Sequence, residues 1–223
     1  MPRPPVPPRK TRSKFSRPLG EIARAFRPQV AVDDCLVACL GGILAEFGER
    51  RGLAIDLRRE VIKQVCGYRG AFGSTSTKIV PNLNVHFRNA RIGQDIEAKE
   101  KQGDTSSRIF LDNVCMDDRT SFPIVGVGPK YWSTQTHLAV RNQAEMDHAL
   151  IVLRATDELV QYFDPFQRPG PVGESPEVIR EIPAVHFLKL WQEAFMGPLW
   201  VLWIAQVRER PSLESFGGRK ADV

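Results

Sequence analysis

The chain has 223 residues, of which 42% are apolar and 26% are charged, so it is expected to fold as one domain and not to remain disordered. No segment approaches the roughly 20 consecutive apolar residues of a membrane-spanning helix, which excludes an integral membrane protein. The first residues lack the apolar segment of a secretory signal, and four cysteines in a chain of this length do not indicate a disulfide scaffold. We therefore expect reduced thiols and a cytoplasmic location.

The positive charge is concentrated at the N-terminus. The net charge of the chain is +5, but residues 1–27 hold eight basic residues and one acidic residue, so the remainder carries −2. We interpret residues 1–27 as a basic, proline-rich flexible arm, either a solvated tail or a docking segment for an acidic partner. Residues 28–207 are expected to form the folded domain and residues 208–223 a polar tail. The charge of the domain does not indicate nucleic-acid binding.

The first strong helical pattern follows two acidic residues. Asp33 or Asp34 can cap a helix by accepting hydrogen bonds from backbone N–H groups of its first turn. Residues 36–47 are apolar on nearly every side, which is typical of a helix at the centre of a core, and Gly48 predicts its end. A second helix is predicted over residues 56–66, where apolar residues recur at helical spacing.

The middle of the chain is less regular. Residues 67–76 are rich in Gly and Ser and predict a connection. Residues 77–87 predict either a helix broken at Pro81 or a helix followed by a strand. Residues 88–108 are polar and charged, which favours a surface excursion.

The second half of the chain consists mainly of predicted strands. Apolar runs predict strands at 122–127, 148–153, 159–163 and 199–204, and a helical pattern covers 184–195. A turn at 155–158 joins the second and third of these strands as an antiparallel hairpin. Because the helices precede the strands and do not alternate with them, the fold class is expected to be α+β.

Cys35 is the candidate nucleophile, because it lies at the start of the buried helix. The positive end of a helix dipole lowers the pKa of a thiol and raises the fraction of thiolate. Gln29, six residues upstream, can fold back over the thiol and form an oxyanion hole with the backbone N–H of Cys35. The charges of Asp33 and Asp34 would oppose a thiolate, so we expect one to cap the helix and the other to face solvent.

A thiolate nucleophile needs a base, and the base needs a partner that orients it. His148 begins one predicted strand and Asp164 follows the next one. Antiparallel neighbours place the start of one strand beside the end of the other, so His148 and Asp164 should lie at the same end of the hairpin. Their spacing suits two strands of about six residues joined by a short turn.

Four segments together resemble a known family. They are residues 29–40 with the pattern QxxxxDCLxACL, residues 121–125 (SFPIV), residues 147–152 (DHALIV) and the pair Asp164-Pro165. In this order they resemble the bacterial C39 peptidases, papain-like cysteine proteases known as bacteriocin-leader-processing domains, whose first motif reads QxxxxDCGxACL. A late aromatic segment before a final apolar strand also fits, so the resemblance extends from residue 29 to about residue 206.

The resemblance implies a papain-like fold in which the nucleophile helix packs on an antiparallel sheet. It implies a thiol protease in which Cys35 is the nucleophile, His148 the general base and acid, Asp164 the orienter and Gln29 the oxyanion donor. This sequence has Leu36 where the family has Gly. No transporter segment accompanies the domain, and the insertions at 88–120 and 129–147 leave the substrate class open.

The sequence therefore predicts a cysteine peptidase that cleaves a peptide or isopeptide bond without a cofactor or metal ion. A zinc site using Cys35 and Cys39 is disfavoured, since no second pair of ligands follows at the usual spacing. Two alternatives remain: a C39-like module that binds a peptide without cutting it, and a thiol acyltransferase or transglutaminase-like enzyme, including a delivered effector. The remaining cysteines and histidines are interpreted as structural: Cys39, Cys66, Cys115, His86, His137 and His186.

Overall fold

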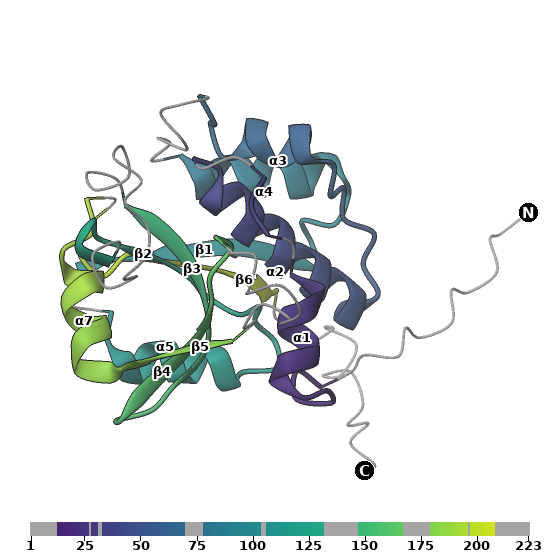
Figure 1. Ribbon diagram of the computed structural model, residues 1–223. Coiled ribbons are helices and arrows are strands. Elements are labelled where there is room, and N and C mark those ends of the chain that lie inside the picture. The colour runs from purple at the N-terminus through teal and green to yellow at the C-terminus, as the bar shows by residue number, and fades with distance from the viewer. Residues whose placement is uncertain are drawn as a thin grey trace, which may run out of the picture.

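The computed structural model describes residues 13–26, 28–30, 33–69, 78–103, 106–131, 147–166, 179–195 and 197–207. These residues form six helices and one six-stranded antiparallel sheet (Figure 1), which confirms the α+β class. The helices are α1 (Leu19–Ala25), α2 (Cys35–Arg51), α3 (Arg59–Val65), α4 (Ile79–Asn89), α5 (Arg108–Met116) and α7 (Ala184–Gln192).

The strands are β1 (Ile96–Lys101), β2 (Ile124–Val127), β3 (His148–Ala155), β4 (Leu159–Phe163), β5 (Arg180–Pro183) and β6 (Val201–Gln206). Their order across the sheet is β1-β6-β2-β3-β4-β5, and every neighbouring pair is antiparallel. The last strand of the chain, β6, therefore lies inside the sheet between β1 and β2, as its apolar sequence predicts.

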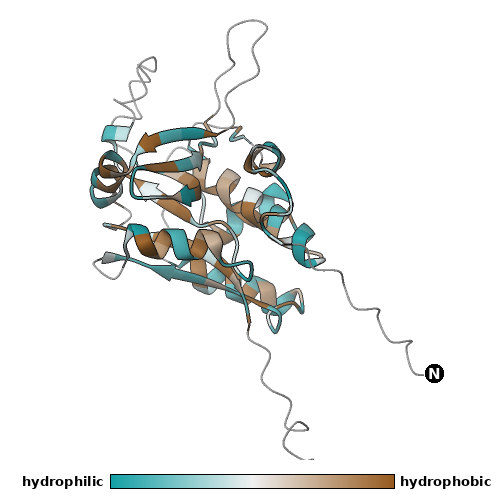
Figure 2. Ribbon diagram, turned by 90° about the horizontal axis from the view of Figure 1, so that it is seen from below, coloured by the Kyte–Doolittle hydropathy of each residue, from teal (hydrophilic) through white to brown (hydrophobic). Residues whose placement is uncertain are grey.

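The sheet separates two layers of helices. Helices α1 to α4 pack on one face and α5 and α7 on the other (Figure 1). Strand β3 is buried on both faces: Ile151 belongs to the core with α2, whereas Leu150 and Val152 belong to the core with α7. This explains its uninterrupted apolar sequence. Figure 2 shows hydrophobic and hydrophilic residues interspersed along the helices, as expected of helices with one face on a core.

Helix α2 lies at the centre of the layer that α1 to α4 form. Gly42 permits a close approach to α1 and β3, since a Cβ at this position would stand only 3.1 Å from Phe26 and 3.4 Å from Ile151. The helix does not end at Gly48, as the sequence predicts, but continues to Arg51. Gly52 caps it, with a φ of 63° in the left-handed conformation that glycine adopts readily.

The middle of the chain differs from its predicted structure. Pro81 lies in the first turn of α4, where a missing N–H is tolerated, so residues 79–89 form one uninterrupted helix. Residues 88–108 are not a simple surface excursion, because β1 pairs with β6 along the edge of the sheet. Helix α5 and the four-residue strand β5 were not predicted.

Residues 13–26 are folded and do not belong to a flexible arm. Helix α1 packs on the core through the buried side chains of Ile22 and Ala23. Lys14 is also buried, and its Nζ donates to the Val114 carbonyl at 2.8 Å. The predicted boundary at residue 27 is therefore wrong for residues 13–26. Residues 1–12 and the predicted tail at 208–223 lie outside the described residues.

Candidate active site

Cys35 is the first residue of α2, as the sequence predicts. The first helical hydrogen bond runs from the Ala38 N–H to the Asp34 carbonyl at 2.9 Å, so the Cys35 N–H precedes the hydrogen-bonded part of the helix. The Cys35 side chain is partly exposed and packs against the core between α1 to α4 and the sheet. One turn further, Cys39 is fully buried and its Sγ lies 3.4 Å from the Ala149 carbonyl oxygen. Cys35 is thus the cysteine of α2 that a substrate can reach.

The two acidic residues before Cys35 do not have the roles that the sequence predicts. The Asp34 side chain makes no capping hydrogen bond and is buried in an ion pair with Arg59 of α3. Asp33 does not simply face solvent, because its Oδ1 accepts a hydrogen bond from the Tyr68 hydroxyl at 2.9 Å. The positive charge of Arg59 offsets the carboxylate that directly precedes the candidate nucleophile.

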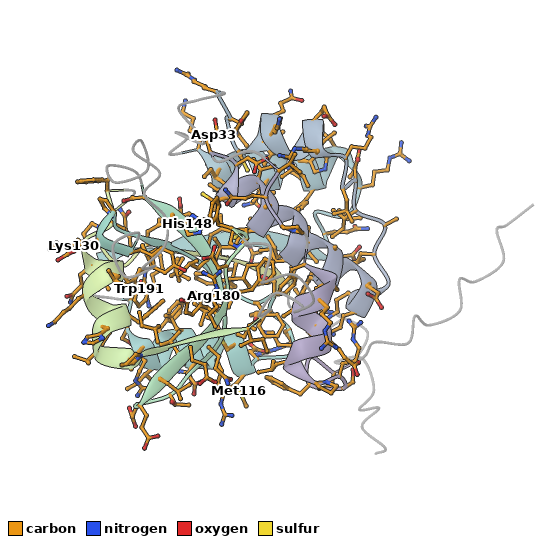
Figure 3. All side chains as sticks on the ribbon, viewed as in Figure 1. Asp33, Met116, Lys130, His148, Arg180 and Trp191 are labelled. Carbon is orange, nitrogen blue, oxygen red and sulfur yellow. The ribbon has the colours of Figure 1, made fainter. Side chains whose placement is uncertain are left out.

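His148 and Asp164 meet at one end of the β3–β4 hairpin, as predicted. Strands β3 and β4 pair in a register that places Ile151 opposite Phe163, so the start of β3 lies beside the end of β4. His148 Nε2 is 2.7 Å from Asp164 Oδ1, and both side chains are buried. Figure 3 shows His148 in the interior of the molecule, between α7 and the helices of the opposite layer.

Asp164 accepts hydrogen bonds on both carboxylate oxygens. Oδ1 accepts hydrogen bonds from His148 Nε2 and from the backbone N–H of Phe166, the latter at 2.8 Å. Oδ2 receives the Tyr131 hydroxyl at 2.7 Å and Arg180 Nη1 at 2.6 Å. Burial raises the pKa of this carboxyl, but the charge and hydrogen bond of His148, the charge of Arg180 and the Tyr131 hydroxyl outweigh it, so the pKa is lowered. Asp164 is therefore ionised in the folded protein at neutral pH.

Tyr131 covers the imidazole of His148. The two rings are stacked, with centroids 5.4 Å apart and planes at 20°. The turn that carries Tyr131 packs tightly on α7: the Gly128 N–H donates to the Leu190 carbonyl at 2.8 Å, and a Cβ at Gly128 would come within 2.6 Å of the Glu193 carbonyl oxygen. The absence of a side chain at Gly128 thus permits the approach that places Tyr131 beside His148.

The imidazole of His148 interacts with both Asp164 and Cys35. Burial lowers the pKa of His148, but the charge of Asp164, the hydrogen bond to Asp164 and the interaction with Cys35 outweigh burial and raise the pKa to about 9. The ordinary value is 6.5. At neutral pH the ring is therefore an imidazolium, which places a positive charge beside the candidate nucleophile.

Gln29 lies beside the same end of the hairpin. Its backbone N–H donates to the Pro165 carbonyl at 2.9 Å, which fixes this residue against the Asp164-Pro165 turn. The side-chain Oε1 is buried within the protein. The structure thus brings the backbone of Gln29 to the site, and its role as an oxyanion donor stays a prediction.

Three side chains of the site were missed in the sequence: Arg59, Tyr131 and Arg180. Each acts through a tertiary contact, and none belongs to a local motif that marks it.

Two of the cysteines interpreted as structural, Cys39 and Cys115, are fully buried. Burial raises the pKa of Cys39 and raises that of Cys115 to about 12, so both thiols are inert.

The other residues interpreted as structural lie at the end of α3 and in α4 and α7. Cys66 is buried in the core between α1 to α4 and the sheet, and His86 and His186 belong to α4 and α7. His137 lies outside the described residues.

The sequence matches no protein-family model, and it matches no curated protein. Across the described residues, no three His, Cys, Asp or Glu side chains gather closely enough to hold a metal ion. No helix in the described part of the chain has the length and apolar character required to cross a membrane.

Proposed function

We propose that this protein is a papain-like cysteine peptidase, similar in its motifs to the C39 peptidases, that hydrolyses a peptide or isopeptide bond. One observation carries the proposal: a buried His148–Asp164 pair, joined at 2.7 Å, whose imidazole interacts electrostatically with the partly exposed Cys35 at a helix N-terminus. A nucleophile, a base and an orienting carboxylate in that order are the parts that thiol-dependent acyl transfer needs.

In the first step, the Cys35 thiolate attacks the carbonyl carbon of the scissile bond. A new C–S bond forms, and the carbonyl electron pair moves to oxygen. The oxyanion is stabilised by the backbone N–H of Cys35, at the positive end of the α2 dipole, together with the side-chain amide of Gln29.

In the second step, the His148 imidazolium gives its proton to the leaving nitrogen as the C–N bond breaks. The amine departs, and the acyl group remains on Cys35 as a thioester. His148 then takes a proton from water as the water attacks the thioester. A C–O bond forms to the water oxygen and the C–S bond breaks, with its electron pair returning to the Cys35 sulfur. The carboxylic acid product leaves, and the Cys35–His148 pair is restored.

A non-cleaving peptide-binding module is the first alternative. The Asp164 cluster argues against it, because burying a carboxylate with an imidazolium and a guanidinium has a substantial desolvation cost. A surface that only binds a peptide gains nothing from that cost, whereas a general base gains a fixed tautomer and orientation. A thiol acyltransferase is the second alternative, since it would use the same acyl-enzyme with an amine in place of water.

The proposal is tested with a proteome-derived peptide library, followed by mass spectrometry of the products. The expected result is a set of new amino termini with the wild-type protein and none with Cys35→Ala or His148→Ala, both of which should remain folded. A second incubation with an added primary amine separates the alternatives: amide products in place of acids indicate an acyltransferase. Peptides that bind but are never cut or transferred would contradict an enzymatic role.

A further inference from the structure

Arg180 approaches Asp164 from the side opposite His148. It is the first residue of β5, paired in the sheet with Tyr162 of β4. Its Nη1 lies 2.6 Å from Asp164 Oδ2, and its Nη2 lies 3.5 Å from the Phe166 carbonyl oxygen. In Figure 3 Arg180 and His148 both lie near the centre of the view, whereas Lys130 lies at its edge.

We propose that Arg180 is a positioning residue of this site: it holds Asp164 with Oδ1 toward His148 and keeps that carboxylate ionised throughout the reaction. The inference rests on the proposed function, because it assigns Arg180 a part in the same triad. Arg180 touches neither the substrate nor the reacting sulfur in this account. It acts through Asp164.

The geometry divides the carboxylate into two halves. Oδ1 faces His148 and the Phe166 N–H, whereas Oδ2 faces Arg180 and Tyr131. With Oδ2 occupied in this way, the carboxylate cannot rotate without breaking two short hydrogen bonds. The lone pairs of Oδ1 therefore remain directed at His148 Nε2.

The charge of Arg180 matters most when His148 is neutral. Among the four donors to Asp164 in the described structure, only Arg180 carries a charge that does not titrate. After His148 has protonated the leaving group, Asp164 is a buried carboxylate whose other donors are neutral. Arg180 then supplies the positive charge that keeps it ionised, as a guanidinium beside an Asp lowers its pKa by roughly 1–3 pH units.

Two of the titratable groups around Asp164 stay protonated in the acid range. Burial, then the charge of Asp164, raises the pKa of Tyr131, and burial raises that of Cys39, so both stay protonated there. The titratable and charged groups that face Asp164 or its partner His148 are Cys35 and Cys39 of α2, Tyr131 after β2, His148 of β3, Tyr162 of β4 and Arg180 of β5.

The experiment measures the rate of Cys35 alkylation by iodoacetamide between pH 4 and pH 9 in wild type, Arg180→Met and Arg180→Lys. In Arg180→Met the acid limb should move up by about one pH unit or more, because Asp164 takes a proton more readily. Arg180→Lys retains the charge, so its acid limb should stay close to that of the wild type. If Arg180→Met does not fold, Arg180→Gln replaces it, since the amide keeps a donor without the charge.

Arg108→Met is the matched control. Arg108 has nearly the same side-chain exposure, 20% against 19% for Arg180, and it also pairs with a carboxylate, that of Asp157. It lies at the far end of the hairpin, where Nη1 donates to the Ala155 carbonyl at 3.0 Å. Its replacement should leave the acid limb unchanged.

A second readout separates this proposal from the proposed function. A ¹³C NMR titration of the Asp164 carboxyl measures its pKa whether or not Cys35 reacts, and the pKa should rise in Arg180→Met but not in Arg180→Lys. An unchanged Asp164 pKa and an unchanged acid limb would overturn the positioning role. Arg180 would then only stabilise the packing of β5 against the end of β4. A raised Asp164 pKa in a protein whose Cys35 is unreactive would overturn the peptidase proposal alone.

Discussion

His148 and Asp164 are 16 residues apart in the chain, yet Nε2 of one lies 2.7 Å from Oδ1 of the other at a fully buried end of the β3–β4 hairpin. The pairing depends on strand register, because Ile151 opposite Phe163 places the start of β3 beside the end of β4. A hairpin thus positions the base and the orienting group together, and helix α2 supplies the thiol from the other layer.

Replacing Asp164 by Asn should lower kcat by about 10²–10⁴ without abolishing turnover. The amide keeps the shape of the carboxylate but removes the charge that stabilises the His148 imidazolium, and it favours the wrong tautomer. Kinetic measurement on any peptide that the wild type cleaves checks this. A variant with wild-type kcat would show that Asp164 has only a structural role.

Replacing Gln29 by Ala should lower kcat by about 10²–10³ with little change in KM, the usual loss for one oxyanion donor. The backbone hydrogen bond of Gln29 to Pro165 remains in the variant, so the turn should keep its place. Gln192→Ala, at the exposed end of α7, is the control. If kcat is unchanged in Gln29→Ala, the residue serves the site through its backbone alone.

The stability of the protein should depend on pH through His148. Its folded-state pKa, about 9, lies above the ordinary 6.5, so its stabilising contribution is complete below pH 6.5 and is lost as the pH rises to 9. A shift of this size corresponds to about 3 kcal/mol. Urea unfolding of wild type and His148→Gln at pH 6 and pH 9 measures it: the difference between the two proteins should shrink by about that amount. A difference that is the same at both pH values would contradict the imidazolium assignment.

Glu46 and Arg50 provide a test of the packing of α2. Both are buried, with Arg50 Nε 2.7 Å from Glu46 Oε1, and Arg50 Nη2 donates to the Thr120 carbonyl at 2.8 Å. Glu46→Gln leaves a buried guanidinium without its counter-charge and should lower the free energy of unfolding by about 3–5 kcal/mol. Glu49→Gln, on the same helix but with a side chain 55% exposed, should cost less than about 1 kcal/mol. Equal losses of unfolding free energy in the two variants would show that the buried Glu46–Arg50 ion pair does not stabilise α2 more than an exposed one does.

The sequence predicts the strands that carry the site because each is an apolar run. It does not predict β1, whose sequence is mostly charged and whose inward-facing side chains are only Ile96 and Ala98. An edge strand exposes one face and one set of backbone groups, so charged residues are suited to it and conceal its pattern. Strand β5 has only four residues, too few for any periodicity.

The same distinction holds for the site. Cys35, His148 and Asp164 follow from motifs and strand spacing. Tyr131 reaches Asp164 across 33 residues, and Arg180 reaches it only through the pairing of β4 with β5. Such contacts depend on the tertiary fold, and no local pattern indicates them. The sequence does not predict the role of Asp34 for a related reason, since its partner is Arg59 on a different helix.

The central proposal is that Cys35 is the reactive cysteine and that His148 activates it, and selective alkylation tests it most directly. The protein is treated with iodoacetamide at pH 6, and the four cysteines are mapped by mass spectrometry over time. The account predicts that Cys35 is modified far faster than Cys39, Cys66 or Cys115 and that His148→Ala removes this advantage, because an imidazolium and a helix N-terminus stabilise the thiolate. Slow labelling of Cys35 at the rate of an ordinary thiol, unaffected by His148→Ala, would contradict it.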